Sequence, residues 1–272
     1  MEGKYNNFLK RTLTSVIVIP LIIFIIFWEK FPLFIVILLL AGFGLNELYS
    51  MARRRGFNPP FILGFILTSY FIFSTIYDLY NLKYDKNIII IFIIILFSII
   101  QLFKKDYSML LPDISIIIFS SIYLGYLFSF ILKIKYLPNG NYYLLSLLFI
   151  TWVNDTTAYI IGTKFGKNKI FPRISPKKSI EGSIGGIISS SISVFILKNW
   201  LSLTFTKLIF LGLVIAIMAQ LGDLFESMLK RGSEVKDSSN LIPGHGGILD
   251  RLDSLLFTAP IFYCYITFFN LI

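Results

Sequence analysis

Long apolar runs separated by short polar connections dominate this chain of 272 residues. A bilayer core of ~30 Å needs ~20 apolar residues for each spanning helix. Nine runs meet or approach this length, and each is predicted to form one membrane-spanning helix. These runs cover residues 12–28, 32–51, 60–80, 88–103, 111–132, 142–163, 180–197, 203–229 and 252–272.

Several of these runs are rich in isoleucine, a β-branched residue that favours strands in water. Within lipid, each segment must satisfy its own backbone hydrogen bonds, so helix is favoured over strand. The run 12–28 is followed by many of similar length, so we interpret it as a retained helix and not as a cleaved signal peptide. The pattern predicts an all-α fold: a polytopic integral membrane helix bundle with about nine transmembrane helices.

Composition supports a single membrane domain. Hydrophobic residues make up 56% of the chain, which is well above soluble composition. No repeat or low-complexity linker divides the sequence, so one transmembrane domain is expected over 1–272. The lone cysteine, Cys264, lies inside the last apolar run, so neither an intramolecular disulfide nor a cysteine metal site is expected.

Lysine and arginine are distributed unevenly among the polar connections. If the N-terminus is cytoplasmic, most of the 25 basic residues lie on the cytoplasmic side, which is the positive-inside pattern. The net charge of +10 is then explained by topology and by contact with anionic lipids, and no nucleic-acid partner is expected. We expect a multi-pass protein of the cell (cytoplasmic) membrane with its N-terminus in the cytoplasm.

Ionisable residues inside the apolar runs are concentrated in the C-terminal half, whereas Glu47 and Asp113 lie near the ends of their runs. Asp155 lies well within the run 142–163, and a carboxylate at the centre of a spanning helix costs roughly 2.5–3.5 kcal/mol on insertion scales. Asp155 is therefore expected to face a cavity, a cation or a partner. A hydrogen bond between helices, supported by the neighbouring Asn154, is the alternative.

The segment "AQLGDLFESMLKR" carries polar residues at helical spacing. Asp223, Ser227 and Lys230 are spaced i, i+4, i+7, which places them on one face of a helix with Glu226 beside them. An ordinary Glu-to-Lys pair at a helix end is the alternative for Glu226 and Lys230. That alternative does not account for Asp223, which apolar residues surround.

The polar stretch "KDSSNLIPGHGGILDRLD" contains the only histidine of the chain, His245. Its Pro243, Gly244, Gly246 and Gly247 prevent a regular helix. Successive backbone N–H groups of such a loop line a concavity that binds phosphate oxygens. A simple turn is the alternative.

Asp250 and Asp253 follow this loop at spacing i, i+3, at the start of the last predicted helix. Two carboxylates on one face suit a hard cation such as Mg²⁺, which proteins hold with one or two carboxylates plus substrate phosphates. Capping of the helix N-terminus is the alternative. It accounts for one acid near a helix start but not for two acids opposite Asp223.

Lys177 and Lys178, in "SPKKSIEGSIGG", add positive charge beside further glycines, although a positive-inside loop would also contain them. Together these residues predict a site for Mg²⁺ and a polyphosphate that faces the cytoplasm. Phosphoryl or nucleotidyl transfer is favoured, because this chemistry mainly requires positioning and charge neutralisation. The chain then divides into N-terminal helices, 1–135, and catalytic helices with cytoplasmic loops, 142–272.

The run "SMLKRGSEVKDSSNLIPGHGGILDRLD" closely resembles the signature of the phosphatidate cytidylyltransferases, the CDP-diacylglycerol synthases. The stretch "NDTTAYIIGTKFGKNKIFPRISPKKSIEG" resembles a second conserved region of that family. The match covers roughly the C-terminal half, Asp155–Asp253, whereas the first five predicted helices resemble the family only in hydropathy. Where many members have Thr-Trp, this chain has Ser179 and Ile180.

The resemblance implies that CTP and phosphatidic acid are converted into CDP-diacylglycerol and pyrophosphate by a Mg²⁺-dependent enzyme that is a homodimer. Whether a second metal or a monovalent cation such as K⁺ joins Mg²⁺ is left open. In the family, the acids aligned with Asp223 and Asp250 hold the metal, and Asp253 belongs to the same site.

Further roles follow if a phosphate oxygen of phosphatidic acid attacks the α-phosphorus of CTP. Lys230, Arg231 and Arg251 are expected to balance the remaining negative charge, and His245 to donate a hydrogen bond to phosphate. We assign substrate binding to Asp155, Lys177, Lys178, Ser227, Lys236, Asp237, Gly244, Gly246 and Gly247.

Two other functions stay open. A related enzyme would activate another lipid phosphate with CTP, or phosphorylate a lipid alcohol. A transporter of cations or protons also carries intramembrane acids, but these are expected near the midplane between repeated halves. The acids of this chain are instead gathered in the C-terminal half and toward the predicted cytoplasmic side.

Overall fold

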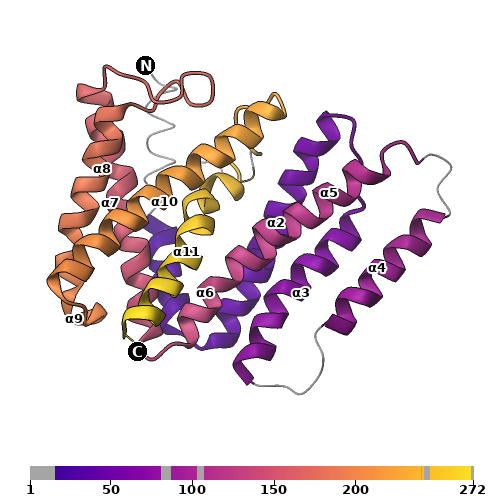
Figure 1. The fold of residues 1–272 in the computed structure, drawn as a ribbon, viewed down its shortest axis with the longest axis horizontal. Helices are drawn as coiled ribbons and strands as arrows, with labels where there is room; N and C mark the ends of the chain where they lie inside the picture. Colours follow the sequence, from indigo (N-terminus) through magenta and orange to yellow (C-terminus); the bar gives the residue numbers. More distant parts are fainter. Residues whose placement is uncertain (1–15, 81–86, 103–106, 240, 242–245, 271–272) are drawn as a thin grey trace.

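The computed structural model describes residues 16–80, 87–102, 107–239, 241 and 246–270. Regular secondary structure within these residues is helical (Figure 1), and an isolated antiparallel bridge joins Lys169 to Ser179. The predicted all-α fold is therefore confirmed for the part of the chain that the structure describes. Helices are the expected solution, since each satisfies its own backbone hydrogen bonds in lipid.

The helices follow one another along the chain with mostly short connections. They are a first helix at Val16–Phe27, then α2 (Lys30–Arg54), α3 (Phe61–Tyr80), α4 (Asn87–Leu102), α5 (Leu110–Ser120), the π-helix η1 (Ser121–Tyr126), α6 (Leu127–Tyr136), α7 (Gly140–Phe165), α8 (Ile180–Ser193), the 3₁₀-helix η2 (Val194–Leu197), α9 (Lys198–Leu201), α10 (Phe205–Gly232) and α11 (Leu249–Asn270).

Six helical stretches among the described residues are long and apolar enough to cross a membrane. They are Lys30–Arg54, Leu110–Tyr136, Gly140–Phe165, Ile180–Leu201, Phe205–Gly232 and Leu249–Phe269. Two of these stretches are composite: one joins α5, η1 and α6, and the other joins α8, η2 and α9. The protein is a multi-pass membrane protein.

The other three predicted spans, at 12–28, 60–80 and 88–103, are not among these six stretches. The first helix is described over Val16–Phe27, whereas α3 has 20 residues, Phe61–Tyr80. Helix α4 has 16 residues, which corresponds to a rise of about 24 Å against a hydrocarbon core of ~30 Å. The structure thus supports six spans, and the number nine stays a prediction.

The helices of the C-terminal half pack most extensively, α7 against α8 and α10 against both α8 and α11 (Figure 1). Glycines in α8 permit this approach. A β-carbon on Gly182 would collide with the main-chain oxygen of Ala158, and one on Gly186 would collide with the side chain of Asn154. Small residues serve the same purpose in membrane helix pairs generally. Helix α4, by contrast, lies at the outer edge of the bundle (Figure 1).

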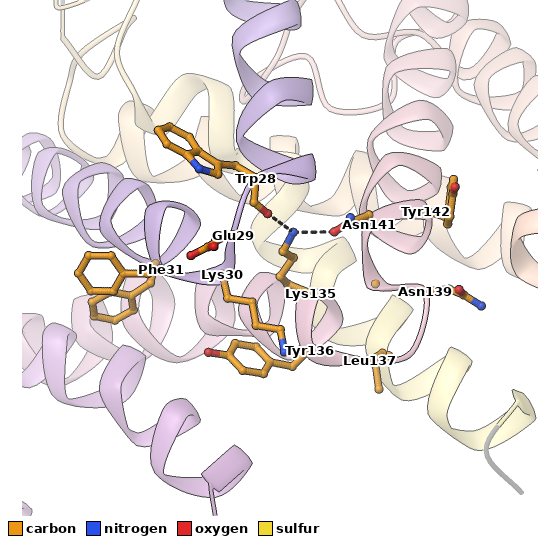
Figure 2. A pocket seen from close by; sticks show the side chains of 12 residues that line it. Trp28, Glu29, Lys30, Phe31, Lys135, Tyr136, Leu137, Asn139, Asn141 and Tyr142 are labelled. Atoms are coloured by element: carbon orange, nitrogen blue, oxygen red, sulfur yellow. Dashed lines mark hydrogen bonds between the residues drawn. The ribbon is translucent and has the colours of Figure 1, made fainter.

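A cavity of about 780 Å³ lies where α2 and α7 begin (Figure 2). The Lys135 ammonium group donates to the main-chain oxygen of Trp28 at 3.0 Å, to Asn141 Oδ1 at 2.5 Å and to the main-chain oxygen of Ile26. These contacts use all three donors of the lysine. Lys135, near the end of α6, therefore holds the connection before α2 close to the start of α7.

Candidate active site

Four chain segments bring charged side chains to the other end of α7. Helix α7 contributes Asp155, α10 contributes Asp223 and α11 contributes Asp253, while Lys178 lies in the connection before α8. The C-terminal halves of α7 and α10 meet the N-terminal turns of α8 and α11 here. Residues far apart in the sequence thus converge at the end of the bundle opposite to the Lys135 cavity.

A groove of about 460 Å³ opens between these segments. Asp155 and Asp223 line it together with Lys177 and Lys178, and Gly182 contributes where α8 approaches α7. The structure therefore brings three predicted substrate-binding residues and one predicted metal ligand into a single concave surface.

Acidic and basic side chains lie side by side in this groove, which Lys169 also lines. Lys178 Nζ lies 2.7 Å from Asp223 Oδ2, and Asp155 is close enough to both residues to interact electrostatically. Asp253 interacts with Asp155 and Asp223, and also with Glu226. Asp155 and Asp223, which line the groove, and Asp253, which interacts with both, are called the groove acids below. Like charges at close range disfavour one another's ionised forms, so the groove acids favour the binding of a cation.

The carboxylate oxygens of the groove acids are ligands that Mg²⁺ prefers. Within the described ranges, however, no three acidic, histidine or cysteine side chains are arranged closely enough to hold a metal ion. The predicted ligands Asp223, Asp250 and Asp253 are thus not gathered into one cluster there. Asp223 and Asp253 lie near each other, whereas Asp250 is held by other groups, and Mg²⁺ binding stays a prediction.

Asp250, in the first turn of α11, is held by Lys230 and by main-chain N–H groups of the preceding connection. Its Oδ1 lies 2.5 Å from Lys230 Nζ, and its Oδ2 accepts from the main-chain N–H of Gly247 at 2.8 Å and of Ser238 at 3.1 Å. Lys230 also lies 2.5 Å from Glu226, four residues earlier on α10. The Glu226–Lys230 pair and the capping contact, which were the alternatives for these residues, are both present.

Arg231 links the end of α10 to the connection that carries the three groove lysines, Lys169, Lys177 and Lys178. Its guanidinium group donates to the main-chain oxygen of Ile174 at 3.2 Å and to that of Val235 at 2.7 Å. Ser227, one turn earlier, is buried. The structure gives Arg231 contacts that hold neighbouring loops together, and its predicted role toward phosphate is untested.

The connection between α10 and α11 carries the remaining predicted residues. Gly246 has a φ of 81°, a conformation that glycine adopts readily, and Gly247 is buried. Gly244 and His245 lie outside the described residues, so their roles stay predictions. Among the described residues of the predicted site, the exposed ones are Asp155, Lys177, Arg231, Lys236, Asp237 and Arg251.

Gln220 is a groove residue that the sequence interpretation overlooked. Its Nε2 donates to Asn154 Oδ1 at 3.0 Å and to the main-chain oxygen of Ser183 at 3.1 Å, and the Ser183 hydroxyl donates to its Oε1. Asn154 Nδ2 in turn donates to Asp155 Oδ1 at 2.9 Å. Gln220 therefore orients Asp155 from α10. The available signal was its spacing of three from Asp223, which puts both on one helix face.

Comparison with known proteins extends the resemblance along the chain. The Cytidylyltransferase family matches residues 9–269. The phosphatidate cytidylyltransferase of Bacillus subtilis is 32% identical over 265 residues, which cover 96% of this chain and 98% of that protein. That of Thermotoga maritima is 36% identical over 263 residues, covering 93% and 94%. That of Staphylococcus haemolyticus is 33% identical over 255 residues, covering 92% and 96%.

This result corrects the expected extent of the resemblance. The first helices were expected to resemble the family only in hydropathy, yet the matched region begins at residue 9. The region that is similar to these relatives therefore includes both the groove and the N-terminal helices. The chain belongs to the Cytidylyltransferase family.

Proposed function

We propose that this protein transfers the cytidylyl group of CTP to phosphatidate, giving CDP-diacylglycerol and pyrophosphate for phospholipid biosynthesis. The observation that carries the proposal is the similarity to phosphatidate cytidylyltransferases over nearly the whole of each chain. The groove supports it, because acids and lysines side by side suit a reaction between a lipid phosphate and a nucleoside triphosphate.

In this reaction, a phosphate oxygen of phosphatidate bonds to the α-phosphorus of CTP. The bond from that phosphorus to the oxygen bridging to the β-phosphorus breaks, and pyrophosphate leaves. A phosphomonoester has a second pKa of ~6, so the attacking group is already largely ionised at neutral pH. The protein therefore needs no nucleophile and no strong base, and its task is to position two anions and compensate their charge.

The lysines of the groove are placed for this compensation. Lys177 and Lys178 lie on its wall, and Lys178 would exchange Asp223 for a phosphate oxygen when substrate binds. Lys230 and Arg251 are proposed to act near the turn before α11, with His245 donating a hydrogen bond to phosphate.

The donor chemistry of the acids fits a divalent cation. We propose that Asp223, Asp250 and Asp253 hold Mg²⁺, for which Asp250 would have to release Lys230. Bound Mg²⁺ would supply charge neutralisation on the departing pyrophosphate. Asp155, which Asn154 orients, is proposed to contact the substrate in the groove.

The proposal includes an orientation. With nine spans and the N-terminus in the cytoplasm, the groove faces the compartment that supplies CTP, in agreement with the positive-inside pattern. Exposed apolar side chains beside the groove suit lateral entry of the lipid substrate; they are Tyr159, Ile160, Ile184 and Ile188. A homodimer is proposed from the family resemblance.

The proposal is tested by measuring pyrophosphate release from detergent-purified protein given CTP, Mg²⁺ and phosphatidic acid, omitting each in turn. Release that requires all three, with CDP-diacylglycerol as the lipid product, is the expected result. Asp250→Asn is expected to abolish release. Full turnover by this variant at saturating Mg²⁺ would remove Asp250 from the metal site without changing the reaction.

The alternative functions predict different results in the same assay. Turnover with another lipid phosphate or with a lipid alcohol, but not with phosphatidic acid, would show that the groove is the active site for a different substrate. Cation movement across vesicles without any nucleotide-lipid product would instead favour a transporter.

A further inference from the structure

Helix α2 of the N-terminal half contributes a carboxylate to the turn before α11. Glu47 is only 4% exposed. Its Oε1 accepts from Ser239 Oγ at 2.6 Å and from the main-chain N–H of Ile248 at 2.9 Å. Its Oε2 accepts from Ser238 Oγ at 2.8 Å and from the main-chain N–H of Leu249 at 2.9 Å. A carboxylate has about four acceptor sites, so these contacts saturate Glu47.

The start of α11 explains why a remote acid is needed. The first N–H groups of a helix have no partner within the helix. The side chains of Gly247, Ile248 and Leu249 carry no hydrogen-bond acceptor. Of the main-chain N–H groups of these three residues, Asp250 accepts from that of Gly247. Glu47, which is 201 residues from Ile248 in sequence, supplies the acceptors for the next two N–H groups. Its negative charge at a helix N-terminus is also favourable.

The Ser238 hydroxyl connects this cap to the candidate site. It lies 2.8 Å from Glu47 Oε2 and 2.9 Å from Asp250 Oδ2. A hydroxyl carries one proton, so the two carboxylates share a single donor. Gly247 makes the arrangement possible, since a β-carbon there would collide with Ser238 Oγ and with both carboxylate oxygens of Glu47.

We propose that Glu47 is a positioning residue for cytidylyl transfer. By holding both sides of the α10–α11 connection, it fixes the turn so that Asp250 keeps its place beside Lys230 on α10. The inference rests on the proposed function, in which Asp250 belongs to the site. It also gives α2 a role in the reaction, although α2 contributes no side chain to the groove.

Glu47→Gln is the direct test, because it puts an amide N–H₂ group where a backbone N–H now donates. Displacement of reacting groups by about 1 Å costs on the order of 100-fold in rate, so we expect kcat per folded molecule to fall by roughly 10- to 100-fold, with KM for CTP changing less. Asp113→Asn is the control, since Asp113 is also a nearly buried acid of the N-terminal half and accepts from the Asn58 N–H at 3.0 Å. It should keep the wild-type kcat.

Ser238→Ala and Ser239→Ala form a milder matched pair. Each removes one hydrogen bond from Glu47, but Ser238 also contacts Asp250. We expect similar losses of thermal stability in both, with kcat reduced roughly 10-fold only in Ser238→Ala. Equal kcat values in the pair, or a wild-type kcat in folded Glu47→Gln, would overturn the proposal.

Trypsin gives a readout that does not depend on activity, since Lys236 is exposed in the same connection. Faster cleavage after Lys236 in Glu47→Gln than in Asp113→Asn is expected if Glu47 holds the turn. Unchanged cleavage would overturn the positioning role even if activity fell. An inactive wild-type protein whose cleavage still depends on Glu47 would refute the proposed function and leave the cap in place.

Discussion

Two groups of carboxylates lie close together at one end of this bundle, and they differ in how their charge is satisfied. The turn acids are Glu47, Glu226 and Asp250. Lys230 pairs with Glu226 and Asp250, while serine hydroxyls and main-chain N–H groups donate to Glu47 and Asp250. The groove acids, Asp155, Asp223 and Asp253, have one another as neighbours and share Lys178.

Exposure follows the same division. The side chains of Glu226, Asp250 and Lys230 are 0%, 9% and 11% exposed, whereas those of Asp223 and Lys178 are 37% and 24% exposed. Buried charges persist only when they are paired and hydrogen-bonded. The turn acids therefore maintain shape, whereas the groove acids Asp155 and Asp223 lie at an open groove lined by lysines and are suited to bind charged ligands.

The largest effect expected from this difference concerns Lys230. Lys230→Met leaves Glu226 and Asp250 without their cation in a buried setting, and breaking a buried ion pair costs about 3–5 kcal/mol. Thermal unfolding in detergent should show a strongly reduced Tm and little folded protein. Lys198→Met, at an exposed lysine of α9, is the control and should unfold like the wild type. Equal stability of the two variants would contradict the structural role of the turn acids.

The groove acids should respond in the opposite way. Asp223→Asn removes one of several adjacent negative charges, so Tm should stay the same or rise. Loss of an electrostatic group at a reacting centre costs about 10²–10³ in kcat, and we expect a fall of that size in pyrophosphate release. A Tm that falls as far as in Lys230→Met would erase the distinction between the two groups. Near wild-type turnover at saturating Mg²⁺ would exclude Asp223 as a metal ligand.

The fold was largely predictable because the membrane restricts the choices. A run such as 142–163 can only be a helix in lipid, and it forms α7, Gly140–Phe165. Length was less predictable. The run predicted at 111–132 continues as helix to Tyr136, because hydropathy alone does not mark where a helix ends.

The groove was predictable in part, because an acid within an apolar run, such as Asp155 or Asp223, has a cost that requires an explanation. The division between groove acids and turn acids was not. Asp250 and Asp253 are three residues apart and looked equivalent, but the first faces Lys230 and the second faces Asp223. The role of Glu47 could not be predicted from its place near the end of an apolar run. Its partners lie some 200 residues away in sequence, and only tertiary packing brings them together.

The smallest effect concerns the side chain that orients a groove acid. Gln220→Met keeps the length of the side chain but removes its hydrogen bonds to Asn154 and Ser183, so Asn154 no longer holds Asp155 firmly. A neutral hydrogen bond contributes about 1 kcal/mol net, so a several-fold fall in kcat/KM is expected. Ser189→Ala removes a hydroxyl of α8 that bonds within its own helix, to Gly186, and is the control. If both variants lower kcat/KM equally, the polar chain through Gln220 only stabilises helix packing; a fall confined to Gln220→Met shows that the groove acids, unlike the turn acids, depend on fine orientation for their function.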